Sequence, residues 1–229
     1  AVASECLEAA GVSDFVFALG HAGVVTSLLD EAGYPADDSR RELALSSLNR
    51  RDPLALAQSL EGAAGSEGAR RALVGLAEDN GIRQSLDAAR LALQGIARAR
   101  TALDELESVT RTLEEAGLRG RVAIDLSESR GLDYYTGLVF RIYGAGLGFD
   151  VGGGGRYDAL LGRLGRPMPA IGFMLGLDRL ALLLGRGGAS GVEEAIAPRP
   201  VKGRTLGEAV REARDRRARG ERIRFEGPA

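Results

Sequence analysis

The densest group of chemically versatile side chains lies in Arg130–Gly137, which reads RGLDYYTG. This segment places a guanidinium, a carboxylate, two phenols and a hydroxyl between two predicted strands. In an extended backbone Arg130 and Tyr134 share one face, whereas Asp133 and Tyr135 lie on the other. One face then offers a guanidinium for a carboxylate or phosphate, together with a phenol donor. A core tyrosine pair with a structural arginine–aspartate contact explains the same residues equally well.

A run of glycines, Gly152–Gly155, precedes Arg156. The run is not a Walker A loop, because no Gly-Lys-Ser/Thr follows, and it lacks the helix and acidic residue of a dinucleotide fingerprint. Consecutive glycines let a backbone approach a planar ligand closely, although a tight turn or bulge is the more common cause. Arg179 falls in the first turn of a predicted helix, where the helix dipole disfavours a cation. We therefore expect Arg156 and Arg179 to meet an anionic ligand or a carboxylate partner.

Composition narrows the possible chemistry. The 229 residues carry a net charge of −2, with 45% hydrophobic and 27% charged residues, which is typical of a globular protein with a real core. Cys6 is the only cysteine and His21 the only histidine, which argues against disulfide scaffolds, zinc clusters and Ser-His-Asp triads. We expect Cys6 to pack within a helix and His21 to lie in a turn or helix cap. The near-zero charge gives no case for nucleic-acid binding, and no apolar run approaches the roughly 20 residues of a membrane span.

The elements that position these residues differ between the two halves of the chain. A helix over residues 1–10 ends at Gly11, and a strand over residues 14–19 is expected to break at Gly20. Residues 24–117 are alanine-rich with helical periodicity and no clear strand. Asp52-Pro53 is an N-cap followed by a first-turn proline. Further helices are expected at 85–97 and 101–116.

The second half is richer in strands, and short glycine turns between them favour antiparallel pairing. Strands are expected at 122–126, at 138–143, at 149–151 ending in Gly152–Gly155, and at 171–174. Helices are expected at 157–164 and 177–184.

The tail begins with a linker over residues 185–203, followed by a helix over 205–219 and a short strand containing Ile223 and Phe225. Residues 211–224 are strongly basic. A solvated helix face with local ion pairs to Glu212, Asp215 and Glu221 is one interpretation, and contact with a phosphate or an acidic partner is the other.

Three segments, in this order, resemble the histidyl-tRNA synthetase family of class II aminoacyl-tRNA synthetases. Residues 130–140 resemble its histidine-binding signature, residues 153–161 its glycine-rich strand and following helix, and residues 169–179 class II motif 3. Residues 14–23 are similar to the strand and turn before the family's insertion. The resemblance covers roughly residues 1–185.

Within that family, residues 102–107 and 122–130 resemble the non-synthetase branch, the regulatory subunits of ATP phosphoribosyltransferase. Motifs 1 and 2 are absent from this chain, and Arg141 stands where the family usually has glutamate. The resemblance implies an α+β fold, a partial class II synthetase-like antiparallel sheet flanked by helices. Its core, truncated at the N-terminus, would span residues 1–185 with a helical insertion at about 36–118. Residues 186–229 would form the linker and tail.

The resemblance also implies a function. The chain would be a regulatory subunit that is not an enzyme on its own, assembling in the cytoplasm with the short-form ATP phosphoribosyltransferase catalytic subunit. It would support the first step of histidine biosynthesis and its feedback by histidine, self-associate, and need no cofactor or metal. A histidyl-tRNA synthetase fragment and a stand-alone amino-acid-binding module are the alternatives.

The residues that the resemblance assigns to a histidine-like pocket are Arg130, Asp133, Tyr134, Tyr135, Gly153, Gly154 and Gly155. Arg156 and Arg179 are assigned to a possible contact with an anion or an ATP-like ligand. No catalytic residue is assigned.

Overall fold

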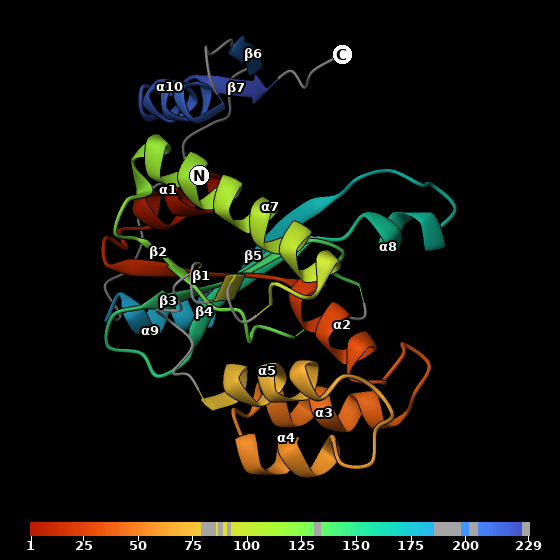
Figure 1. Ribbon diagram of the computed structural model, residues 1–229. Helices are drawn as coiled ribbons and strands as arrows, with labels where there is room; N and C mark the ends of the chain where they lie inside the picture. Colours follow the sequence, from red (N-terminus) through yellow and green to blue (C-terminus); the bar gives the residue numbers. More distant parts are fainter. Residues whose placement is uncertain are drawn as a thin grey trace.

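The computed structural model describes residues 1–78, 86, 89–90, 93–130, 134–185, 198–201 and 206–225. At its centre lies a five-stranded sheet in the order β2-β1-β3-β4-β5, with helices packed around it (Figure 1). The strands are β1 (Phe15–His21), β2 (Val122–Ile124), β3 (Leu138–Gly144), β4 (Asp150–Arg156) and β5 (Ile171–Leu175). β1 pairs with β2 in parallel, and every other pair is antiparallel. The expected mixed fold is confirmed, and so is antiparallel pairing for β3, β4 and β5, whereas β2 pairs in parallel.

The described part of the segment between β1 and β2 contains helices joined by turns and no strand, as the periodicity predicts. It comprises α2 (Ala22–Glu31), α3 (Arg40–Asn49), α4 (Pro53–Ser59), α5 (Glu67–Glu78), α7 (Ala97–Leu113) and the π-helical turn η1 (Glu114–Leu118). The Asp52 carboxylate accepts a hydrogen bond from the Ala55 amide at 2.9 Å, so α4 begins at the predicted cap. Of the helix expected at 85–97, residues 85, 87–88 and 91–92 lie outside the described residues, and residues 93–95 form a turn instead of a helix.

Helices α3, α4 and α5 form a helical lobe at one end of the molecule, away from the sheet (Figure 1). α1 (Val2–Ala9) and α7 instead lie beside the sheet. Phe17, Leu19 and Phe140 point towards these two helices, and Leu103 and Leu106 of α7 are fully buried. This apolar layer fixes one face of β1 and β3 and leaves their other face to the polar residues described below.

The structure corrects the expected strand break at Gly20. β1 continues through Gly20 to His21, because Gly20 is paired with Val139 of β3. A Cβ atom at Gly20 would lie 2.5 Å from the carbonyl oxygen of Asp125. The glycine therefore permits close backbone approach rather than ending the strand.

From the local pattern, Gly152–Gly155 were expected at the end of a short strand, whereas the resemblance implied a glycine-rich strand that includes Gly153–Gly155; the structure agrees with the resemblance. They lie inside β4 and pair with β3 on one side and β5 on the other. Glycine has a low intrinsic preference for strands, but ladder hydrogen bonds to β3 and β5 hold these residues extended.

The structure confirms the expectation for the single histidine but not the one for the single cysteine. His21 caps α2, and its Nδ1 accepts from the Gly23 amide at 3.1 Å, which confirms the cap. Its Nε2 lies 3.0 Å from a carboxylate oxygen of Glu105 on α7. Cys6 was expected to pack within its helix, but it is exposed on α1, because the buried positions there are Ala3, Ser4 and Leu7.

The tail contains α10 (Leu206–Ala218) and two parallel strands, β6 (Pro198–Val201) and β7 (Arg222–Phe225). Arg216 pairs with Glu221, which agrees with the expectation of local ion pairs. Arg214 and Arg217, however, pair with Glu8 and Glu5 of α1, more than 200 residues away in sequence. The basic face of α10 is thus partly a docking surface for α1.

The remaining two helices are short. α8 (Asp158–Arg163) follows β4, and α9 (Leu177–Leu183) follows β5, both where the sequence predicts them. Each begins within two residues of a strand end, so its first turn lies beside the edge of the sheet.

Candidate functional site

A cluster of charged side chains lies on the sheet face opposite α1 and α7. Its centre is Glu128, whose side chain is 3% exposed. Glu128 accepts hydrogen bonds from Arg130 Nη2 at 2.8 Å and from Arg141 Nε at 3.2 Å. A buried carboxylate is tolerated only when cations or hydrogen-bond donors compensate it, and here two guanidiniums do so.

Asp150, at the start of β4, is the second carboxylate of the cluster. It accepts from Arg179 Nη1 at 2.9 Å, and its backbone carbonyl accepts from the same nitrogen at 2.6 Å. Arg130 Nη1 lies 3.4 Å and Arg141 Nη1 lies 3.9 Å from its carboxylate oxygens. The expected carboxylate partner of Arg179 is therefore Asp150, which outweighs the unfavourable helix dipole.

The charged cluster, defined as Glu128, Arg130, Arg141, Asp150 and Arg179, holds three cations against two anions. Burial lowers the pKa of Arg130, but hydrogen bonding to Glu128 and Tyr143 raises it by more. The net pKa of Arg130 therefore lies above its ordinary value. The guanidinium stays charged at any physiological pH. With all five groups ionised, the cluster carries one positive charge in excess and favours an anionic group nearby.

Two glycines of β4 form a floor beside this cluster. A Cβ atom at Gly153 would lie 3.3 Å from Arg141 Nη1, and one at Gly155 would lie 2.8 Å from the ring of Tyr135. Gly154 faces the other side of the sheet, where a Cβ atom would meet Gly172 and Phe173 of β5. The alternation of a strand thus brings Gly153 and Gly155, but not Gly154, to the charged cluster.

The two tyrosines lie beside this floor, with the ring centroids of Tyr134 and Tyr135 4.3 Å apart and the ring planes tilted by 47°. Tyr157 lies further along, 6.4 Å from the Tyr135 centroid. Burial, followed by hydrogen bonding with Tyr134, raises the pKa of Tyr135 far above its usual value. Its phenol therefore remains a neutral donor. Asp133, also predicted for this site, lies outside the described residues.

Arg156 lies apart from the charged cluster. It follows Gly155 on the opposite face of β4, and its Nε donates to Asp158 Oδ2 at 2.8 Å. The amide of Ala170 and then Arg156 hold the pKa of Asp158 below its usual value. Arg156 thus meets a carboxylate partner, but it joins α8 to the strand rather than facing the floor.

Sequence reasoning did not single out Glu128 or Asp150 as site residues. Glu128 precedes Arg130 by two positions, the spacing at which both side chains of an extended segment share a face. Asp150 immediately precedes the buried part of a strand that is otherwise glycine and valine. In both cases, a carboxylate next to a run of buried residues was the feature of the sequence that could have indicated a site residue.

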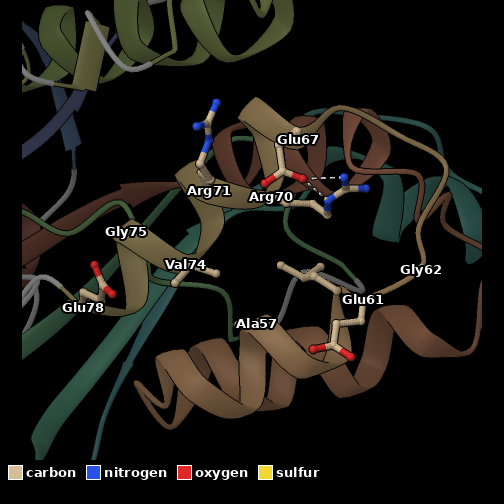
Figure 2. Close-up of a pocket in the computed structure, with 10 residues that line it drawn as sticks. Ala57, Glu61, Gly62, Glu67, Arg70, Arg71, Val74, Gly75 and Glu78 are labelled. Carbon is tan, nitrogen blue, oxygen red and sulfur yellow. Dashed lines mark hydrogen bonds and ion pairs between the residues drawn. The ribbon is translucent and has the colours of Figure 1, made fainter.

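A second concave region lies in the helical lobe, between α4 and α5 (Figure 2). It has a volume of about 710 Å³ and is lined by apolar residues such as Ala57 and Val74 together with charges of both signs. Figure 2 shows Arg70 turned back onto Glu67 of its own helix, where Nη2 and Oε2 are 2.5 Å apart. None of the predicted site residues lines this groove, and its mixed charges identify no class of ligand.

The residues that the structure describes contain no group of three or more His, Cys, Asp or Glu side chains placed to hold a metal ion. None of their helices combines the length and the apolar character needed to cross a membrane.

The chain is similar in sequence and structure to proteins of one known family. A family model described as histidyl-tRNA synthetase matches residues 1–180. An ATP phosphoribosyltransferase regulatory subunit from Moorella thermoacetica is 37% identical over 227 residues, covering 99% of this chain and 57% of that protein. One from Carboxydothermus hydrogenoformans is 40% identical over 174 residues, covering 76% of this chain and 52% of that protein.

Among solved structures, an ATP phosphoribosyltransferase regulatory subunit/histidyl-tRNA synthetase from Bacillus halodurans superposes with a TM-score of 0.70 at 30% identity. The match covers 98% of this chain and 57% of that one. The chain therefore spans little more than half the length of the relatives it matches.

Proposed function

Because the chain belongs to the histidyl-tRNA synthetase family, we propose that it acts as a regulatory subunit of ATP phosphoribosyltransferase in the cytoplasm. The observation that carries this proposal is the identity of 37% over 99% of the chain to a relative bearing that name. The partner would be the short-form catalytic subunit, and the reaction supported would be the first step of histidine biosynthesis.

The ligand that we propose for the candidate pocket is histidine. The candidate pocket comprises the charged cluster, Tyr134, Tyr135 and the strand residues Gly153 and Gly155. An excess positive charge suits the ligand's carboxylate, and the Tyr135 ring, which lies over Gly155, offers an aromatic face and a phenol to the ligand's imidazole. Feedback is then a coupling free energy: histidine shifts the population of subunit states, and the partner senses that shift.

The proposal includes no chemical step on this chain alone. Arg141 places a cation beside the glycine floor. Its guanidinium donates to Glu128, so the Glu128 carboxylate is neutralised and is not available as a base. Arg179 already binds Asp150 through a carboxylate and a carbonyl. The arginines therefore support ligand binding and positioning within the assembly.

The first test is co-purification with the short-form catalytic subunit, using both this chain and a version extended to the length of its relatives. Formation of phosphoribosyl-ATP is then assayed with and without histidine. A stable complex with raised, histidine-sensitive activity is the expected result. If the extended version forms no complex and changes no activity, the regulatory role is wrong.

A second test measures histidine binding directly by calorimetry. Arg130→Met should weaken binding by about tenfold to a hundredfold, because a charge-assisted hydrogen bond contributes roughly 1.5–3 kcal/mol. Arg163→Met on α8 removes the same charge away from the candidate pocket and is the matched control. Equal affinities for the two variants would contradict the assignment of Arg130.

We include self-association in the proposal. β5 is an edge strand of the sheet, and Ile171 and Met174 on it are 68% and 63% exposed. An exposed apolar edge favours pairing with another chain. Ile171→Lys should lower the sedimentation coefficient to that of a monomer, whereas an unchanged oligomer would place the contact elsewhere.

The alternative function is that of a histidyl-tRNA synthetase, which the description of the matching family model favours. It predicts histidine-dependent exchange of pyrophosphate into ATP. Such exchange by the extended version, without any effect on phosphoribosyl-ATP formation, would select this alternative.

A further inference from the structure

Arg51 has a backbone φ of 53° and is the sole residue other than glycine with positive φ in the described part of the chain. It follows the last turn of α3 and precedes Asp52, the cap of α4. Glycine or asparagine is preferred at such a helix end, because a longer side chain crowds the backbone in the left-handed region. An arginine held there calls for a compensating interaction elsewhere.

That interaction crosses from the helical lobe to the sheet. Arg51 Nη2 lies 2.8 Å from Oδ2 of Asp125, whose side chain is 3% exposed. The other carboxylate oxygen of Asp125 accepts from the amide and the hydroxyl of Ser127, at 3.1 and 2.6 Å. A carboxylate this deeply buried depends on its cation, and the cation comes from a different part of the fold.

The loop that Arg51 reaches is the one that leads into the candidate pocket. Residues 125–129 are buried throughout, and Glu128 of the charged cluster lies between Ser127 and Ser129. The Asp125 amide donates to Leu19 of β1 at 2.7 Å, which places the loop against the sheet. A second contact joins the same two regions, since Ser129 Oγ donates to Asn49 Oδ1 at 2.8 Å.

We propose that Arg51 is a positioning residue: its pairing with buried Asp125 holds the loop that carries Glu128 and Arg130, and so couples the helical lobe to the candidate pocket. Asn49 strengthens this connection through Ser129. A partner that moves the helical lobe would thereby change the position of Glu128, and a ligand of the pocket would change the position of the lobe.

The test uses Arg51→Gly in the full chain. Glycine adopts a φ of 53° without steric cost, so the turn between α3 and α4 is retained while the guanidinium is lost. Hydrogen exchange followed by mass spectrometry should show amides at residues 126–130 exchanging faster by on the order of tenfold, with exchange in β3 and β4 unchanged. Arg51→Lys should restore part of the protection.

Arg50→Gln is the matched control, because Arg50 is the preceding residue and its side chain donates to the Ser46 hydroxyl on the exposed surface. It should leave exchange at 126–130 unchanged. Unchanged exchange in Arg51→Gly would overturn the proposal, as would an equal increase in every element, which indicates general destabilisation.

Ligand binding is the second readout, and it alone rests on the proposed function. Arg51→Gly should weaken histidine binding severalfold, although Arg51 lies outside the candidate pocket. If the unmodified protein does not bind histidine, the proposed ligand is wrong and the exchange measurement still decides the role of Arg51. If it binds histidine and Arg51→Gly binds equally well, the coupling is absent.

Discussion

Asp150 binds the guanidinium of Arg179 twice, through its carboxylate at 2.9 Å and through its backbone carbonyl at 2.6 Å. The two residues are 29 positions apart and belong to different elements, the start of β4 and the first turn of α9. This relationship ties a helix start to the strand that supplies the glycine floor. It also makes Asp150 the shared partner of three arginines.

Asp150→Asn should therefore lower the free energy of unfolding by about 1–3 kcal/mol, since it weakens hydrogen bonds to charged donors that are partly shielded from water. Urea denaturation followed by circular dichroism measures the change. Asp178→Asn, an exposed carboxylate on the same helix as Arg179, should change stability little and is the control. Equal losses from both variants would contradict a special role for Asp150.

Gly155→Ala tests the glycine floor. The new methyl group would lie 2.6 Å from the Leu138 carbonyl oxygen and 2.8 Å from the Tyr135 ring, so the strand or the ring must shift. We expect a loss of about 1–3 kcal/mol in unfolding free energy, which is typical of overpacking. Gly148→Ala adds the same methyl group where nothing lies within 4 Å, and it should be tolerated.

Tyr135 should ionise at a higher pH than a free phenol, whose pKa is about 10. Its pKa is raised in the folded state, so its contribution to stability is complete below the unfolded pKa of about 10 and is lost as pH rises towards the folded value. Ultraviolet titration of the phenols should show a late phase that disappears in Tyr135→Phe. The same titration curve in both proteins would contradict the raised pKa.

The docking of α10 on α1 should depend on salt. Arg214 donates to both carboxylate oxygens of Glu8, at 2.7 and 2.8 Å, and all four side chains in the two pairs with Glu5 and Glu8 are partly exposed. Salt at 1 M shortens the screening length to about 3 Å and should expose α10 to limited proteolysis. Glu8→Gln should cause the same exposure at low salt, whereas Glu61→Gln in the helical lobe should not.

Local patterns were sufficient to predict most elements. Asp52-Pro53 marked the start of α4, and the run of strand-favouring residues at 138–143 marked β3. Two glycine positions defeated this reasoning, because Gly20 and the run in β4 act through close contact with backbone from other strands. The sequence pattern of one segment does not reveal which other segment packs against it and therefore requires a glycine.

For the candidate site, too, the sequence predicted individual residues but not the partners that they contact. Arg130, Tyr135 and Arg179 were predicted, and the structure brings them to one face of the sheet near Gly153 and Gly155. Their partners were not predicted, because the pairing of Arg179 with Asp150 depends on the register of β4 and the position of α9. The partners of α10 required even longer contacts, such as Arg217 with Glu5, 212 residues apart.

The parallel pairing of β1 with β2 has a consequence for folding kinetics. About one hundred residues separate Phe17 from its partner Val122, so this pair forms only after a very long loop closes. The helical lobe, rich in local contacts, should acquire structure first, and the pairing of β2 should be among the slow steps. Closure entropy rises only with the logarithm of loop length, by about 0.6 kcal/mol per doubling. Evolution can therefore lengthen or shorten this crossover with little thermodynamic penalty while the strand register stays intact.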